Sequence, residues 1–371
     1  MKKNFKNIIK AFALCVVIIM ATVLSACSQS GGETALEYKG NKISEAMYGY
    51  WSARFKGNIL YNYNNGKDSA DFWSNKLDNG QTAEKYFTEI VVGQINKYAV
   101  CGKLFDEYGL KLSGEVKKAI DDDIAEKIEY YGSRAELNAE LAKINLNINM
   151  LRDIYICEEK LNAVYSYLYG KGGTEALTDD DYKAYFKENY WHMKYIVVYT
   201  TKLATDEQGK NKYDTSGSLL TEDLNKEELA AKKAKVAEAL EKAQAGENFD
   251  SLIKTYSEFD TSSYPNGFYL SANELSTYGE QIVAALPGLA TDECALIEEP
   301  KAIYIIKKLE LPELDELGSD DLAQLQDMQS YANGKTFDAK INALSGDINV
   351  NKEIVAKYKL ADIAVNADSN F

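Results

Sequence analysis

The chain has 371 residues, of which 46% are hydrophobic and 27% charged, a composition that excludes a disordered protein and allows two or three domains. Its net charge of −15 excludes a nucleic-acid-binding protein, because phosphate contacts require clustered lysine and arginine. The single histidine, His192, excludes metal sites built from several histidines, and we expect neither a metal nor another cofactor.

The first 26 residues have the layout of a secretory signal peptide. Four lysines among the first ten residues precede an apolar run over 11–24, which is shorter than the ~20 residues of a membrane span. A transmembrane anchor is the alternative. The run ends in Leu24-Ser25-Ala26-Cys27, which resembles a bacterial lipobox and implies cleavage before Cys27 and lipid on its sulfur. Residues 27–35 then form a lipidated Ser/Gly tether.

Cleavage would leave three further cysteines and a more acidic chain. The leader contains four lysines and no acid, so its removal takes the net charge from −15 to −19. Cys101 and Cys157 lie on apolar helical stretches, where a small buried thiol is the usual interpretation. Together with Cys294 they make an odd number without metal-like spacing, and a single disulfide stays open.

Residues 36–175 predict a helical domain. Residues 36–43 indicate a short strand and turn, and Ser44 is suited to cap the helix that follows. Apolar residues at helical spacing predict helices over 45–64, 83–108, 113–131, 135–144 and 147–169. The acidic run 121–123 indicates a solvated helix face rather than a cation site, because consecutive helical residues point in different directions.

After the glycine-rich boundary at 170–173, the pattern changes to mixed helix and strand. Thr178 and Asp181 form a capping-box signature for a helix to Tyr190. The polar range 203–225 predicts a long loop or a flexible hairpin. The remaining elements are predicted as a strand over 191–199, helices over 226–244 and 248–256, a strand over 267–271, a helix over 275–286, and strands over 295–298 and 302–309. This order predicts a small antiparallel sheet with helices packed on it.

The last part of the chain, 313–371, returns to helix. The pattern predicts helices over 320–331 and 337–344, then a strand or short extension over 348–355. This segment has few large apolar residues, and so small a segment is unlikely to bury a core alone. We therefore expect it to pack on the N-terminal helices, with the sheet domain inserted between them.

The stretch from Ala245 to Ser271 resembles the middle of a parvulin-type peptidyl-prolyl isomerase domain. It contains Gly-Glu-x-Phe-x-x-Leu, then Tyr-Ser-x-x-Asp-x-Ser-Ser, and it leads through a glycine turn into a strand. Residues 188–312 match the parvulin layout, with an insertion at about 201–225, and the opening strand, turn and long helix resemble PrsA- and SurA-type foldases. The resemblance implies an α+β fold, in which a mostly helical chaperone-like body carries an inserted parvulin-like domain.

The resemblance also implies a site, in altered form. Both histidines of the family are tyrosine in this chain, Tyr195 and Tyr304, and His192 cannot replace Tyr195 because it lies on the opposite face of the strand. The family's Cys-or-Asp position falls on Asp260, or on Phe259 if the register shifts by one. The proline-binding side chains correspond to Leu275 and Tyr278, with Phe268 after the glycine turn.

The loss of both histidines leaves two interpretations of the activity open. Isomerisation has an uncatalysed barrier of ~18–20 kcal/mol. An enzyme lowers it by binding the twisted amide more tightly, without proton transfer. Tyrosine hydroxyls can still donate hydrogen bonds to a carbonyl, so a weakened isomerase is one interpretation. The other is a groove that only binds.

Three functions are therefore considered. The first is a foldase tethered to the extracytoplasmic face of a bacterial membrane, which binds unfolded or proline-containing secreted polypeptides and catalyses X-Pro isomerisation. The second is a non-catalytic holdase chaperone of the same architecture. The third is a solute-binding lipoprotein that serves a transporter, which would need two α/β lobes, whereas residues 45–190 are almost purely helical in pattern.

We predict that Cys27→Ala yields a chain without lipid that is released from the membrane, because the lipid would be attached to the Cys27 sulfur. Mass spectrometry of the wild type and membrane fractionation of both forms measure this. Wild-type chain without lipid, together with a variant that stays in the membrane, would contradict the prediction.

Overall fold

The computed structural model describes residues 31–77, 80–214, 217–274 and 279–365, and it has an α+β fold. The described residues fall in two compact units. Unit 1 contains the residues up to Ala176 and those from Lys335, and unit 2 contains Leu177–Gly334. Unit 2 is therefore inserted into the sequence of unit 1. Cys27 lies outside the described residues, as do Leu275 and Tyr278.

Unit 1 is mostly helical and carries a small sheet. Its strands have the order β2-β1-β9, with β1 at Thr34–Tyr38, β2 at Asn41–Ser44 and β9 at Asn349–Val350. Side chains of Ser44, Ser113 and Asn147 cap three of its helices, each accepting from the backbone N–H three residues on. The helices before unit 2 are α2 (Glu45–Asn64), α3 (Ala70–Ser74), α4 (Ala83–Glu107), α5 (Gly114–Tyr131), α6 (Arg134–Ala142) and α7 (Ile148–Tyr169).

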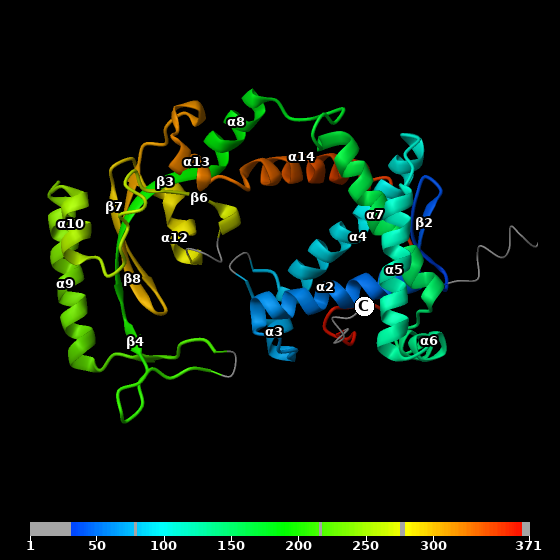
Figure 1. The fold of residues 1–371 in the computed structure, drawn as a ribbon, viewed down its shortest axis with the longest axis horizontal. Helices are drawn as coiled ribbons and strands as arrows, with labels where there is room; N and C mark the ends of the chain where they lie inside the picture. The colour runs from blue at the N-terminus through cyan, green and yellow to red at the C-terminus, as the bar shows by residue number, and fades with distance from the viewer. Residues whose placement is uncertain (1–30, 78–79, 215–216, 275–278, 366–371) are drawn as a thin grey trace, which may run out of the picture. The chain divides into compact units, whose positions relative to one another are not determined.

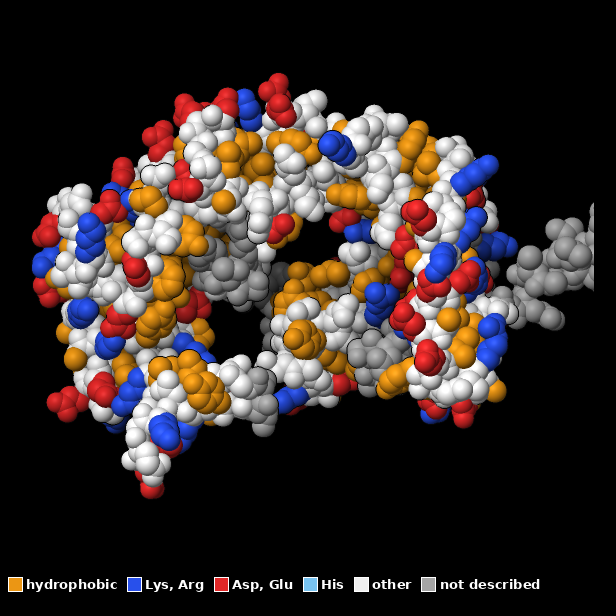
Figure 2. All heavy atoms as spheres, in the orientation of Figure 1, with side chains coloured by type: hydrophobic (Ala, Val, Ile, Leu, Met, Phe, Trp, Pro, Cys, Tyr) orange, Lys and Arg blue, Asp and Glu red, His pale blue; other side chains and the backbone are white. Residues whose placement is uncertain are grey.

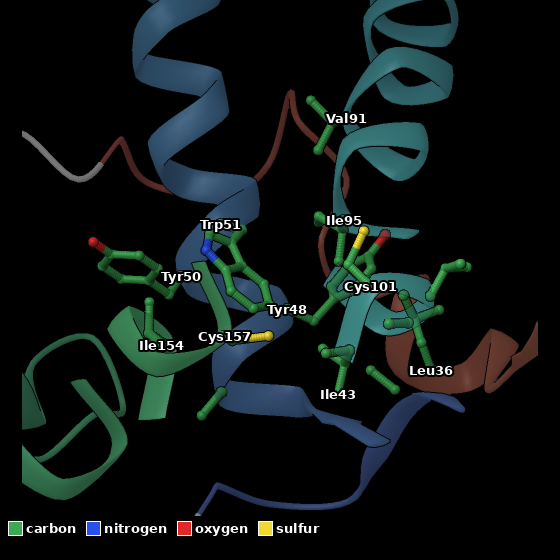
Figure 3. Close-up of a cluster of buried hydrophobic side chains, with 14 of the residues drawn as sticks. Leu36, Ile43, Tyr48, Tyr50, Trp51, Val91, Ile95, Cys101, Ile154 and Cys157 are labelled. Carbon is green, nitrogen blue, oxygen red and sulfur yellow. The ribbon is translucent and has the colours of Figure 1, made fainter. Parts of the chain in front are cut away.

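The core of unit 1 lies where α2, α4 and α7 meet (Figure 3). Trp51 is fully buried, stacks on Tyr98 with ring centroids 4.1 Å apart, and donates from Nε1 to Glu158. Cys101 and Cys157 are buried free thiols in this core, as the sequence predicts. Burial raises the pKa of each to about 12, so both stay protonated and unreactive.

The three adjacent aspartates on α5 form ion pairs with three different cations. Asp123 and Lys127 are 3.5 Å apart, while Asp121 pairs with Arg152 and Asp122 with Lys118. No group of three or more histidine, cysteine or acidic side chains among the described residues is placed to hold a metal ion. The run is therefore a charged helix face with separate partners.

The C-terminal segment divides differently from the prediction. Residues 313–334 belong to unit 2, and only the residues from Lys335 pack in unit 1. The two predicted helices are instead a short α13 (Ser319–Ala323) and one continuous α14 (Met328–Ser345) through Gly334. A glycine inside a helix costs about 1 kcal/mol. Burial of Met328, Ala332 and Phe337 on α14 offsets this cost.

The end of the chain closes the core of unit 1. Strand β9 pairs with β1, and the short helix α15 (Lys352–Val355) buries Ile354. The fully buried ammonium of Lys56 on α2 donates to the Ile363 carbonyl at 2.7 Å and pairs with Asp68 at 2.6 Å. A buried lysine needs such partners, so Lys56 fixes the tail against α2.

Unit 2 is built around a four-stranded antiparallel sheet with the order β6-β3-β8-β7. The order of elements follows the prediction, and Thr178 forms the predicted capping box with Asp181 at the start of α8. The elements are α8 (Asp179–Asn189), β3 (Tyr190–Tyr199), α9 (Lys226–Gln244), α10 (Phe249–Tyr256), β6 (Phe268–Ser271), α12 (Glu280–Ala285), β7 (Cys294–Glu299) and β8 (Ala302–Leu309).

Both faces of this sheet are covered. Ile196 and Val198 on β3 pack with apolar side chains of α9 and α10, while Met193, Tyr195 and Val197 share a core with residues of α12. Figure 1 shows α9 and α10 on one side of the sheet and α12 on the other. Strand β3 is therefore apolar on both faces, and its alternation decides which side chain meets which helix.

Of the two predictions for the insertion after β3, a long loop or a flexible hairpin, its described residues form the hairpin. Strands β4 (Thr201–Leu203) and β5 (Thr221–Asp223) form its base, and isolated bridges Thr205↔Asn211 and Tyr213↔Leu219 continue it. The sequence repeats Asp-x-x-Gly eight residues apart, at 206–209 and 214–217. In both repeats the aspartate Oδ1 accepts a backbone N–H four residues on, which closes each turn.

The outer surface of α9 and α10 carries charged side chains of both signs, lysines and acidic residues (Figure 2). These residues form local ion pairs such as Lys242–Glu238 on α9, at 2.8 Å. Exposed pairs of this kind contribute little to stability.

Among the described residues, no helix has the length and apolar character to cross a membrane.

We predict opposite effects of alanine at two glycines of α4. A Cβ at Gly102 would lie 2.4 Å from Asn41 Nδ2, which donates to the Ala99 carbonyl, whereas one at Gly93 meets nothing within 4 Å. Gly102→Ala should lower the free energy of unfolding by about 1–3 kcal/mol. Gly93→Ala should raise it by about 0.5–1 kcal/mol. Urea denaturation measures both, and a stabilised Gly102→Ala would contradict the packing.

Candidate functional site

Unit 2 contains a groove of about 710 Å³ beside β3. It is lined by β3, the end of α10, the loop between α10 and β6, and the first residue of β6. Four aromatic side chains from these elements line it: Tyr195, Phe259, Tyr264 and Phe268. Polar and charged side chains line the rest of the groove, so aromatic rings and charged groups meet in one concave site.

Unequal strand lengths create the edge on which this groove forms. Strand β6 pairs only with residues 190–193, so the rest of β3 has an open edge on that side. The segment after α10 occupies this edge: Glu258 N–H donates to the Val197 carbonyl at 2.8 Å, and Val197 N–H donates to Ser257 Oγ at 3.3 Å. The Tyr199 N–H donates to the Glu258 carboxylate at 2.9 Å. These bonds position the following residues, Phe259 and Asp260.

The aromatic residues divide into a buried floor and exposed walls. Tyr195 stacks on Phe268 with ring centroids 4.9 Å apart, and the two side chains are 8% and 4% exposed. Phe259 and Tyr264 are 42% and 38% exposed and lie 6.4 Å from Tyr195 and 4.6 Å from Phe268, respectively, between ring centroids. A flat apolar group entering the groove would therefore meet rings from β3, β6 and the loop.

Tyr304 is next to Tyr195, but it does not line the groove. Tyr304 pairs with Val197 in the β3–β8 ladder, so Tyr195 and Tyr304 are diagonal neighbours on one face. Their ring centroids are 5.7 Å apart in an edge-to-face arrangement. Burial raises the pKa of the Tyr304 hydroxyl, so this phenol is protonated at neutral pH.

Asp260 lines the groove from the loop. Its Oδ1 accepts the Ser262 N–H at 2.9 Å, and this bond holds the pKa of the Asp260 carboxyl below its usual value. Asp260 is thus an ionised carboxylate that accepts a hydrogen bond from the backbone of its own turn. Phe259, the alternative for this position in the sequence, also lies in the groove, so both registers lead to the same site.

His192 lies away from the groove, on the face of β3 opposite Tyr195, as strand alternation predicts. Its ring stacks on Tyr269 of β6, with centroids 4.5 Å apart and planes 5° from parallel. Both ring nitrogens lie 2.8 Å from backbone carbonyl oxygens, those of Glu310 and Asn266. His192 therefore has no direct place in the chemistry of the groove.

Tyr264 and Lys194 also line the groove, although neither is among the site residues expected from the sequence. Tyr264 lies in a polar turn, and Lys194 forms a 2.6 Å ion pair with Asp250 at the rim. Two aromatic residues within the polar turn run 257–265 were the available signal, because exposed aromatic side chains in a loop often bind partners.

No protein-family model matches this chain, and no curated protein sequence matches it. Solved structures do. The foldase protein PrsA from Streptococcus pneumoniae str. Canada MDR_19A is 19% identical to this chain and matches it with a TM-score of 0.24. The match covers 76% of this chain and 93% of the PrsA chain. PrsA from Bacillus subtilis is 21% identical, with coverages of 79% and 94% and a TM-score of 0.23.

A third similar structure comes from the report of PEB4 and Cj1289, two SurA-like chaperones of Campylobacter jejuni. It is 10% identical, covers 86% of this chain and 98% of its own, and has a TM-score of 0.24. This chain is similar to PrsA foldases and to SurA-like chaperones.

Proposed function

We propose that this chain is an extracytoplasmic foldase or chaperone, tethered through lipid on Cys27, whose groove in unit 2 binds proline-containing segments of unfolded secreted polypeptides. One observation carries the proposal: Tyr195 and Phe268 form a buried aromatic floor between the half-exposed rings of Phe259 and Tyr264. A proline ring is compact and apolar, and aromatic faces bind such groups with large contact area.

The size of the groove supports a short peptide segment as its ligand. A volume of about 710 Å³ falls in the range of small-ligand sites and suits a few residues rather than a folded partner. The β3 edge is already bonded to Ser257 and Glu258. Recognition at this place therefore uses side chains that line the groove, and not the addition of a strand to the sheet.

The proposal includes prolyl-isomerase activity in this groove. The groove would favour the twisted amide over the planar one, with the Tyr195 hydroxyl as the donor to the peptide carbonyl. Tyr304 contacts the Tyr195 ring and so acts through it as a positioning residue. Asp260 supplies a negative carboxylate at the rim, which disfavours an acidic residue beside the proline.

A non-catalytic holdase is the second candidate, and one observation favours it. Tyr195 lines the groove and Tyr304 does not, so these two phenols do not converge on one carbonyl there. A solute-binding lipoprotein is less well supported, because the described part of unit 1 is a helical body with a three-stranded sheet rather than an α/β lobe. A measurement of prolyl-isomerase turnover separates the foldase from the holdase.

We predict that Tyr195→Phe lowers prolyl-isomerase turnover by about tenfold, the value of one hydrogen bond made in the transition state, while peptide affinity changes less than threefold. Tyr304→Phe should lower turnover less, since Tyr304 contacts the Tyr195 ring and does not line the groove. A protease-coupled assay with a prolyl tetrapeptide and residues 28–371 measures turnover. Wild-type turnover no faster than the uncatalysed rate would leave the holdase as the function.

We predict that Phe259→Ala weakens binding of a proline-containing peptide by about five- to twentyfold, because it removes one aromatic wall of the groove. The matched control is Tyr213→Ala, since Tyr213 is an aromatic residue in the insertion after β3 that is 58% exposed and does not line the groove. Fluorescence-anisotropy titration with a labelled peptide measures both variants. Equal losses in both variants, or none in Phe259→Ala, would show that the groove is not the binding site.

A further inference from the structure

We propose that His192 is a pH-sensitive positioning residue that holds one wall of the groove. Its ring nitrogens both face backbone carbonyl oxygens at 2.8 Å, with Nδ1 toward Glu310 and Nε2 toward Asn266. A neutral imidazole has one N–H donor and one acceptor nitrogen, so it can bond only one of these carbonyls. The doubly protonated ring bonds both. We call this pair of contacts the His192 bridge; its effect on binding rests on the function proposed above.

The ring is held in place for this role. His192 is 8% exposed. In the sheet it is paired with Leu309 on β8 and with Tyr269 on β6, so the strand is fixed on both sides. The Tyr269 ring covers one face of the imidazole in a parallel stack. Rotation of the side chain would lose the stack and both polar contacts, so the number of protons on the ring decides how many bonds form.

One peptide group connects the His192 bridge to the groove. Asn266 is followed by Gly267, whose φ of +112° is a conformation that favours glycine. A Cβ at Gly267 would lie 2.6 Å from the Met193 carbonyl oxygen and 3.2 Å from His192 Nε2, so this turn packs directly on β3 and the imidazole. The next residue, Phe268, is the groove floor, and Tyr264 on the other side of the turn is a wall.

The charged side chains around the ring engage other partners. On α13, Asp321 accepts from the Asn266 side-chain amide at 3.0 Å, and on β8, Lys308 donates to the carbonyls of Leu286 and Leu289. Lys194 of β3 pairs with Asp250. The remaining charged residues that line the cavity beside the ring are Lys187, Glu188 and Glu313. The ring nitrogens themselves are engaged by peptide carbonyls.

The direction of the pH effect follows from this geometry. On the acidic side of the imidazole titration both contacts form, and the turn before Phe268 is held. On the alkaline side one nitrogen carries a lone pair that faces a carbonyl oxygen, and that contact opens. Glu310 follows Leu309, which the ladder holds opposite His192, so the contact that opens is the one to Asn266. Raising the pH therefore releases the groove wall.

The first test uses the wild type, residues 28–371, without peptide. His192 is the only histidine, so the ring ¹⁵N signals need no assignment. The Gly267 amide belongs to the peptide group of the Asn266 carbonyl, and the Leu311 amide to that of Glu310. We expect the Gly267 amide signal to shift with the same midpoint as the imidazole, and the Leu311 signal to shift less. A Gly267 signal that does not follow the imidazole would overturn the proposal.

The second test measures binding of the labelled tetrapeptide Ala-Ala-Pro-Phe between about pH 5 and 8, the range in which histidine is the side chain that normally changes charge. Wild-type affinity should fall about two- to tenfold across this range, the effect of one hydrogen bond. His192→Gln and His192→Phe, which keeps a ring against Tyr269, should both show a flat profile. A wild-type slope in both variants would overturn the proposal. Absence of binding at every pH would refute the groove instead, and the first test would still decide the His192 bridge.

Discussion

The ladder between β3 and β8 is the interaction on which unit 2 depends. It runs without interruption from His192↔Leu309 to Tyr199↔Ala302, and β3 presents apolar side chains to both faces. A shift of one residue would exchange the two faces of β3 and move Tyr195 away from the groove. The same register fixes His192 on the opposite side, between two carbonyls. The floor of the groove and the support behind it are therefore set by one pairing.

The incomplete pairing of β3 on its other edge is what leaves room for a site. Strand β6 is only four residues long, so the loop after α10 bonds the remaining edge and then bulges outward with Phe259 and Asp260. An open strand edge would invite aggregation, and the loop covers it. The protein thus uses one segment both to protect an edge and to build the wall of a binding groove.

Unit 1 depends on contacts between the two ends of the sequence. Strand β9 and the tail around Ile354 complete a sheet and a core that begin at Thr34, and Lys56 bonds the carbonyl of Ile363 from the interior of α2. Such contacts close loops of some 300 residues, and loop-closure entropy rises only slowly with length. An insertion as large as unit 2 is therefore tolerated, because each unit buries its own core.

The sequence by itself determined most elements: strand alternation at 191–199, the capping box at Thr178, and the buried thiols. These follow from local periodicity and end signals, which act over a few residues. Only the tertiary structure decided that α14 continues through Gly334, that β4 and β5 pair in the insertion, that Tyr304 lies outside the groove, and that Tyr264 lines it. Those outcomes depend on which distant side chains bury a segment, and burial between segments far apart in the chain leaves no local pattern to interpret.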